Sequence, residues 1–379
     1  MNGARQTLDT VVGERTLIVC VGSGGVGKTT VAATIALWGA KQGRKVLVLT
    51  IDPARRLANS LGLSEFGNAE KRIDLSELDF SEGGELYAMM LDTRTTFDQL
   101  IRSTAPDEAT ARRILANPIY QTMSDTFAGS QEYMAAEKLH DVVVSGNYDL
   151  VVLDTPPVKN ALDFFEAPGR LSRFMDRQVI DWFLLPPSTG LLSSVVHGTG
   201  AIVWRLLGYV FGSEFLGDLA EFLQLFKDMV DGFRERHERV LDLFRSNDTR
   251  FLTVCAPTEP SVEVAGFFAE ELRKHDYPRG GLIVNQVHVS AAGALEAGVL
   301  LGEAARELAS DLEPRTAASL VARLGAAHGR LRQQAGTEGE LISRVSPIAG
   351  GVLVEVPRLE HEVHDLHGLL AVAGHLFEG

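Results

Sequence analysis

The sequence predicts an α/β protein, with a mostly parallel sheet flanked by helices and an inserted helical subdomain. Three short apolar runs, at residues 16–21, 45–51 and 148–153, each end directly before a glycine-rich or aspartate-containing turn. Nearly continuous apolar character is typical of parallel strands that are buried on both faces. Residues 160–245 interrupt the alternation of strands and helices. The alternation predicts the layered sheet, and the interruption predicts the helical insertion.

The charge balance excludes several classes of protein. Of 379 residues, 36 are basic and 50 are acidic, which gives a net charge of −14. Such a chain lacks the positive field that draws proteins onto nucleic acid or anionic lipid. We therefore expect no nucleic-acid partner and at most a peripheral association with membranes.

The cysteine content and the N-terminus both favour the cytoplasm. Cys20 and Cys255 are the only cysteines, which excludes a CxxC metal site and a disulfide scaffold. Both are expected to be small core residues. Charged residues precede the first apolar run, so no secretion signal is expected. Residues 182–204 carry no formal charge, but prolines and glycines interrupt them, and we do not expect a membrane span there.

The first element is the strand at residues 16–21, and a glycine-rich loop follows it. Residues 22–30 read GSGGVGKTT and match the phosphate-binding pattern G-x-x-x-x-G-K-[ST], ahead of a helical run that Gly43 can end. Glycines let successive backbone N–H groups curve around a phosphate, which side chains would block. We predict that a nucleoside triphosphate binds through Gly24, Gly25, Val26, Gly27, Lys28, Thr29 and Thr30.

Three side chains of this loop have predicted tasks. Lys28 reaches the β- and γ-phosphate oxygens, and the Thr29 hydroxyl completes the Mg²⁺ shell. Thr30 contacts the α-phosphate. Lys28 is therefore predicted to be a catalytic cation as well as a binding residue.

The second strand, at residues 45–51, ends at Asp52. A carboxylate at the C-terminal end of a strand beside the phosphate loop lies where open α/β sheets bind ligands. Asp52 is therefore a candidate for orienting the attacking water. The alternative is that Asp52 caps a short helix at residues 57–61, and the spacing leaves both roles open.

The third strand, at residues 148–153, ends at Asp154, and Thr-Pro-Pro follows. An apolar strand that ends in aspartate is the Walker B arrangement, in which the carboxylate holds Mg²⁺ directly or through its water. Asp154 and Thr29 are therefore the predicted metal-site residues. A turn cap is the alternative role for Asp154.

Together these segments resemble the arsenite-pump and tail-anchored-protein-targeting ATPase family, a branch of the P-loop proteins that includes the MinD and ParA partition ATPases. Residues 24–30 are similar to the family's phosphate loop, residues 50–57 to its switch I segment, and residues 154–157 to the start of its switch II. The resemblance covers most of residues 16–170 and 250–375. It implies a P-loop NTPase of the SIMIBI type, with ATP and Mg²⁺ as its ligands.

The resemblance also assigns residues outside the phosphate loop. In the family an asparagine at the position of Asn285 reads the adenine ring, and Pro357 with Glu362 is similar to the loop that covers adenine. No guanine-specific Asn-Lys-x-Asp motif is visible, so the resemblance implies ATP rather than GTP. The nucleotide-binding domain is then expected in two parts, residues 1–159 and 246–379, with the helical subdomain at residues 160–245 between them.

The sequence departs from the family in two ways. The family has a signature lysine that reaches across the dimer to the partner's nucleotide, and this position is Ser23 here. Arg55 or Arg56 could supply a substitute charge, or both could be ordinary surface arginines. The thiolates that bind arsenite in the pump, and the zinc-binding CxxC pair of the eukaryotic targeting factor, are also missing.

The helical insertion has a pronounced apolar pattern. The residues at helical spacing, predicted to line one face of a helix, are Phe215, Leu219, Phe222, Phe226, Met229 and Phe233. Such a face either packs in the core or a dimer interface, or it lines a groove for a hydrophobic client, and the pattern leaves both open. Further along, residues 305–345 predict one or two solvated helices with a loop near residues 336–339.

These observations predict a cytoplasmic, Mg²⁺-dependent ATPase that couples its cycle to the handling of a hydrophobic or membrane-protein client. The alternatives are the ATPase subunit of an anion exporter and a weakly hydrolysing, nucleotide-gated partner subunit. The sequence has one phosphate loop, and the family forms its active sites at a subunit interface. The chain is therefore expected to form a homodimer, or a heterodimer with a related ATPase.

Overall fold

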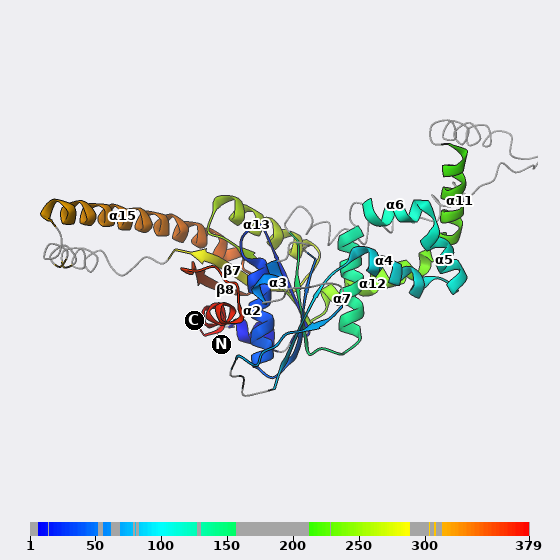
Figure 1. The fold of residues 1–379 in the computed structure, drawn as a ribbon, viewed down its shortest axis with the longest axis horizontal. Helices are drawn as coiled ribbons and strands as arrows, with labels where there is room; N and C mark the ends of the chain where they lie inside the picture. Colours follow the sequence, from blue (N-terminus) through cyan, green and yellow to red (C-terminus); the bar gives the residue numbers. More distant parts are fainter. Residues whose placement is uncertain are drawn as a thin grey trace, which may run out of the picture.

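The computed structural model has one central sheet with helices on both faces (Figure 1). It describes residues 7–13, 15–51, 56–61, 69–78, 80, 83–126, 130–156, 212–227, 229–288, 303, 307 and 313–378. Within these residues, eight strands lie in the order β3-β4-β2-β5-β1-β6-β7-β8, and only β3 is antiparallel to its neighbour. The mostly parallel sheet confirms the predicted fold class. The strands are β1 (Leu17–Gly22), β2 (Lys45–Thr50), β3 (Lys71–Arg72), β4 (Glu85–Met90), β5 (Leu150–Asp154), β6 (Thr249–Cys255), β7 (Arg279–Val287) and β8 (Val352–Pro357).

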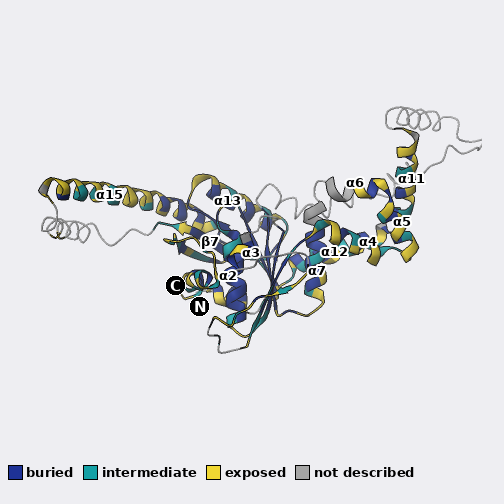
Figure 2. Ribbon diagram, in the orientation of Figure 1, coloured by how far each residue is buried: buried dark blue, intermediate teal, exposed yellow. Residues whose placement is uncertain are grey.

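The central strands are buried on both faces, as their apolar runs predict. In β1, Leu17, Val19 and Val21 belong to one hydrophobic cluster, whereas Ile18 and Cys20 belong to another. Successive side chains of a strand point to opposite faces of the sheet. The sheet therefore separates two cores, and the interiors of its central strands are buried (Figure 2).

The first core lies under α2 (Lys28–Lys41), with α1 (Leu8–Gly13) and α16 (Leu366–Phe377) beside it and α3 (Arg56–Ser60) near its start. Most of α2 is buried, and Gly39 lies so close to β5 that a Cβ there would be 2.9 Å from Leu150 Cδ2. The close packing fixes α2 against the sheet. It thereby fixes the loop that precedes α2.

The second core joins the opposite face of the sheet to a layer of helices, which extends away from the sheet (Figure 1). This layer includes residues 93–144, which precede β5, and so draws on more of the chain than the predicted insertion at residues 160–245. Residues 157–211, which contain the charge-free stretch at 182–204, lie outside the described residues. The helices are α4 (Thr93–Thr104), α5 (Glu108–Ala116), α6 (Pro118–Thr126), α7 (Ser130–Val144), α11 (Ser213–Lys227) and α12 (Val230–Arg245).

The apolar stripe of the insertion lies on two helices, so the prediction of one helical face is wrong. The chain turns between α11 and α12, where Met229 N donates to Phe226 O at 2.9 Å. Phe222, Phe226 and Phe233 are at most 5% exposed. The rings of Phe222 and Phe226 are tilted to each other with centroids 5.0 Å apart, and those of Phe226 and Phe233 are stacked at 5.2 Å. Phe215 is 40% exposed. For the central aromatic residues, these contacts favour core packing over a client groove.

The segment before β8 is one long helix, α15 (Pro314–Val345), followed by the short turn η1 (Ser346–Ile348). The predicted loop near residues 336–339 is therefore wrong. A glycine costs about 1 kcal/mol relative to alanine inside a helix, and neighbouring strong helix formers offset this cost. Leu341, Ile342 and Val345 anchor the end of α15 in a third apolar cluster, while its outer part is mostly exposed (Figure 2). Within the described chain, no helix is both long and apolar enough to cross a membrane.

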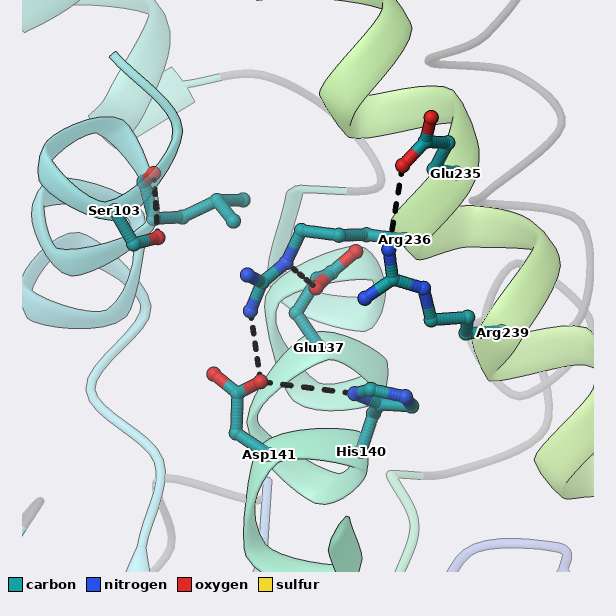
Figure 3. A network of polar contacts seen from close by, with 8 residues as sticks. Ser103, Glu137, His140, Asp141, Glu235, Arg236 and Arg239 are labelled. Carbon is teal, nitrogen blue, oxygen red and sulfur yellow. Dashed lines mark hydrogen bonds and ion pairs between the residues drawn. The ribbon is translucent and has the colours of Figure 1, made fainter. Parts of the chain in front are cut away.

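A buried ion pair joins α7 to α12 (Figure 3). Arg236 Nε donates to Glu137 Oε2 at 2.9 Å, and Arg236 Nη2 donates to Asp141 Oδ1 at 2.7 Å. The Glu137 side chain is 1% exposed and that of Arg236 is 21% exposed. A buried carboxylate is strongly destabilising without a cation beside it. The pair therefore fixes how these two helices meet.

We expect Arg236→Met to lower the free energy of unfolding by about 3 kcal/mol, the low end of the range for breaking a buried pair, because Arg236 is partly exposed. The matched control is Arg239→Met on the same helix, where Arg239 and Glu235 form an exposed pair at 3.3 Å. This control should change stability little, because exposed pairs contribute little. Urea unfolding followed by circular dichroism measures both variants, and equal effects would contradict the assignment.

Candidate nucleotide-binding site

The phosphate loop is formed where β1 passes into α2. Gly25 and Gly27 have φ angles of 78° and 90°, in the left-handed region that favours glycine. Val31 N donates to Gly27 O at 2.9 Å, so α2 begins directly after the loop. The N–H groups of a first helical turn lack partners within the helix and attract anions. The loop therefore has the backbone geometry of a phosphate site.

Lys28 is the first residue of α2, and it is 6% exposed. Its Nζ atom donates to Ser23 O at 2.8 Å, so the side chain turns back onto the loop from which it starts. In phosphate loops this lysine binds the β- and γ-phosphate oxygens of the nucleotide. Lys28 lies beside the loop, where such a contact can form.

Asp154 ends β5, where it pairs in register with Cys20 of β1 and Thr50 of β2. It is 1% exposed. Thr29 Oγ1 and Thr50 Oγ1 donate to Asp154 Oδ2 at 2.7 and 3.0 Å. The predicted metal-site residues Thr29 and Asp154 are thus in direct contact, although they are far apart in the sequence.

Thr50 is a site residue to which no sequence motif assigns a role, although it begins the segment that resembles switch I. The available signal is a polar residue at the end of an otherwise apolar strand. Thr50 belongs to the site because β2 lies directly beside β5 in the sheet, which brings Thr50 next to Asp154. The pattern of apolar and polar residues in one sequence does not show the order of the strands.

The oxygen atoms at this point suit Mg²⁺. Magnesium prefers oxygen ligands and is usually held by one or two carboxylates together with the phosphates of its substrate. Thr29 and Asp154 supply a hydroxyl and a carboxylate beside the loop. Across the described residues, no three His, Cys, Asp or Glu side chains are arranged to hold a metal alone. The donor set therefore fits an ion that binds together with a nucleotide.

A cavity of about 600 Å³ opens beside the loop. Of the predicted binding residues, Gly25, Gly27, Lys28, Thr29, Thr30, Asn285 and Pro357 line it. The end of β8 and the segment after it form another wall. The family resemblance points to Pro357 and Glu362 there, and further lining residues of this wall are Arg358, Leu359, Glu360, His361, Val363 and His364. The cavity thus brings the phosphate loop, the end of β7 and the segment after β8 together at one site.

Ser23, at the position of the family's signature lysine, takes part in a local hydrogen-bond network. Its Oγ atom lies 3.0 Å from Ser261 Oγ in α13 (Glu259–Lys274). Ser261 Oγ also accepts from Ala256 N at 2.9 Å. The serine therefore links the loop, through Ser261, to the residue that follows β6.

Several predicted residues lie outside the described part of the chain. These are Asp52 and Arg55, together with the side chain of Arg56. The roles of Asp52 as a water-orienting residue, and of the arginines as substitute cations, stay predictions.

The two cysteines are core residues rather than thiolate ligands. Burial raises the pKa of Cys255 to about 12. Burial, together with the nearby Asp154 carboxylate, raises the pKa of Cys20 well above its usual value. A soft metal or arsenite would require deprotonated thiols, and these environments disfavour deprotonation.

The loop between β1 and α2, with its lysine and an aspartate at the end of a neighbouring strand, defines a P-loop nucleoside triphosphatase. The family model described as anion-transporting ATPase matches residues 15–292, and the chain belongs to this family. The resemblance inferred from the motifs is thereby confirmed, and the protein is an ATPase.

Relatives of known name support the same assignment. The chain is 25% identical over 287 residues to "ATPase GET3" of Podospora anserina, which covers 74% of this chain and 76% of the relative. It is 26% identical over 285 residues to "ATPase get3" of Aspergillus terreus, with the same coverage of both chains. These relatives are similar to the chain over most of its length.

Proposed function

We propose that the chain hydrolyses ATP at this cavity with Mg²⁺ as the metal. Lys28 would bind the β- and γ-phosphate oxygens, and the backbone N–H groups of the loop would bind the same phosphates. Thr29 and Asp154 would hold the ion. Bound Mg²⁺ would neutralise charge that develops on the transferring phosphoryl group. The contact between Thr29 and Asp154 beside the loop, in a chain of an ATPase family, carries this proposal.

Steady-state phosphate release tests the metal and the nucleotide together. We expect turnover with ATP and Mg²⁺, and its loss when EDTA replaces Mg²⁺ in otherwise equal buffer. Adding Mg²⁺ back should restore the rate. Equal rates with and without the ion would overturn the metal assignment.

The role of Asp52 is tested by Asp52→Asn, which conserves the size of the side chain. We expect turnover to fall by at least about 100-fold, the usual scale for losing an acid–base group, whereas ATP affinity should stay within a few fold. If the variant turns over like wild type, Asp52 is a helix cap and another group orients the water. Phosphate release and a nucleotide-binding titration give the two numbers.

We also propose that the ATPase cycle serves a hydrophobic segment of a membrane-protein client, in the cytoplasm and as a dimer. The support is the family resemblance and the apolar residues of the insertion at positions 164–185, which lie outside the described residues. Co-expression with a tail-anchored test segment gives a direct test. We expect a complex that remains in solution and is released by ATP turnover; recovery of the segment only in the membrane fraction would oppose the proposal.

Ser23 favours one second candidate, a weakly hydrolysing partner subunit that works with a related ATPase. The family's lysine is missing, and Ser23 is bound to Ser261 within its own chain. Turnover of the isolated protein separates the two candidates. A rate that rises only when a lysine-containing relative is added would favour the partner subunit.

A further inference from the structure

The end of β7 contacts the phosphate loop through two neighbouring amide side chains. Asn285 Nδ2 donates to Val26 O at 2.8 Å, and Gln286 Nε2 donates to Gly25 O at 3.3 Å. Asn285 is 9% exposed. Gln286 has a φ of 65°, unusual for a residue other than glycine. Both side chains therefore reach backbone carbonyls of the loop from the strand two places away from β1 in the sheet.

The Asn285 amide also packs against the loop at a second point. A Cβ atom on Gly27 would lie 2.2 Å from Asn285 Nδ2. The amide thus occupies the space that a side chain at position 27 would need. Gly27 is required by this packing as well as by its φ of 90°.

The end of β7, which carries these two amides, is itself held by a contact from α15. Glu338 of α15, 5% exposed, accepts from His288 N through Oε2 at 2.7 Å, and its Oε1 lies 2.7 Å from His288 Nδ1. Both carboxylate oxygens therefore engage the residue directly after β7. Because the end of β7 is already held in place, the hydrogen bond from Asn285 to the loop costs little conformational entropy when it forms. This bond can therefore restrain the loop effectively.

We propose that Asn285 is a positioning residue that holds the phosphate loop in its ligand-binding shape before a nucleotide arrives. Its amide bonds Val26 O and fills the space beside Gly27, and Glu338 holds the strand end in place. This task differs from contact with a base, because it acts on the loop backbone and operates without ligand. The inference deepens the proposed function and rests on it for the identity of the site.

Hydrogen exchange of the ligand-free protein, measured by mass spectrometry, tests this role without any nucleotide. In Asn285→Ala we expect the peptide that covers residues 22–30 to exchange between about twofold and tenfold faster, the size of one neutral hydrogen bond. A peptide covering residues 85–90 in β4 should exchange as in wild type. Asn147→Ala, the same change in an exposed turn, is the control and should alter neither peptide.

The outcomes separate the loop-holding role from the others. Unchanged exchange at residues 22–30 would overturn the proposal, and so would faster exchange at both peptides, because the residue would then stabilise the whole fold. If Asn285→Ala does not fold, Asn285→Asp removes the donor and conserves the shape; failure of both to fold also overturns it. Failure of the proposed function would appear separately. In that case wild type would show no ATP turnover, while Asn285→Ala would still exchange faster than wild type at residues 22–30.

Discussion

Replacing Lys28 by alanine should weaken ATP binding by at least about tenfold and lower ATP turnover still more. A charge-assisted contact to phosphate contributes about 1.5–3 kcal/mol, and a tenfold change in affinity corresponds to about 1.4 kcal/mol. Turnover should fall further, on the order of 1,000-fold, because charge grows on the phosphoryl oxygens in the transition state. Nucleotide-binding titrations and phosphate release measure the two effects.

A second lysine of the same helix provides the control. Lys41 lies in the last turn of α2, where its Nζ is 3.9 Å from Glu378 Oε1 and 4.8 Å from the Trp38 ring centroid. Lys41→Ala removes the same charge at the far end of the helix, so ATP affinity and turnover should stay near wild type. If Lys28→Ala binds ATP as tightly as wild type does, the loop between β1 and α2 is not the nucleotide site.

Most of the central sheet is predictable from the sequence, because its strands are apolar without interruption. The runs at residues 16–21, 45–51 and 148–153 appear as β1, β2 and β5, shifted by at most two residues at either end. The phosphate loop is equally visible, since its glycines and lysine are adjacent in the chain. The sequence therefore predicts those features whose physical cause lies in neighbouring residues of the chain.

The contacts that assemble the site are not predictable in this way. The bond between Thr50 and Asp154 depends on β2 lying beside β5, and the bond from Asn285 to Val26 O joins residues 259 positions apart. The periodicity of apolar residues does not predict contacts between residues so far apart in the sequence. The prediction of one continuous helical face at residues 215–233 fails for a related reason. The apolar spacing of three and four continues through the turn at Met229, between α11 and α12. Burial on both sides of the turn produces the same pattern as one continuous helix.

The stripe across that turn leads to the second large effect. Replacing both Phe222 and Phe226 by serine should leave a protein that barely folds. Truncating a buried phenylalanine costs about 3–5 kcal/mol, and a typical domain has only about 5–15 kcal/mol of stability in total. The two rings are neighbours, with centroids 5.0 Å apart, so the cost of the double replacement should differ from the sum of the single costs.

Phe215→Ser is the matched control, because Phe215 lies at the start of the same helix and is 40% exposed. It should shift the urea midpoint only slightly, since little apolar surface leaves the core. The double variant distinguishes the two roles that the spacing alone leaves open. A double variant that unfolds at much lower urea places the stripe in the core, and any client must then bind elsewhere in the insertion. A double variant with a wild-type midpoint would show that these rings do not stabilise the fold, and the groove would again be the better explanation of their spacing.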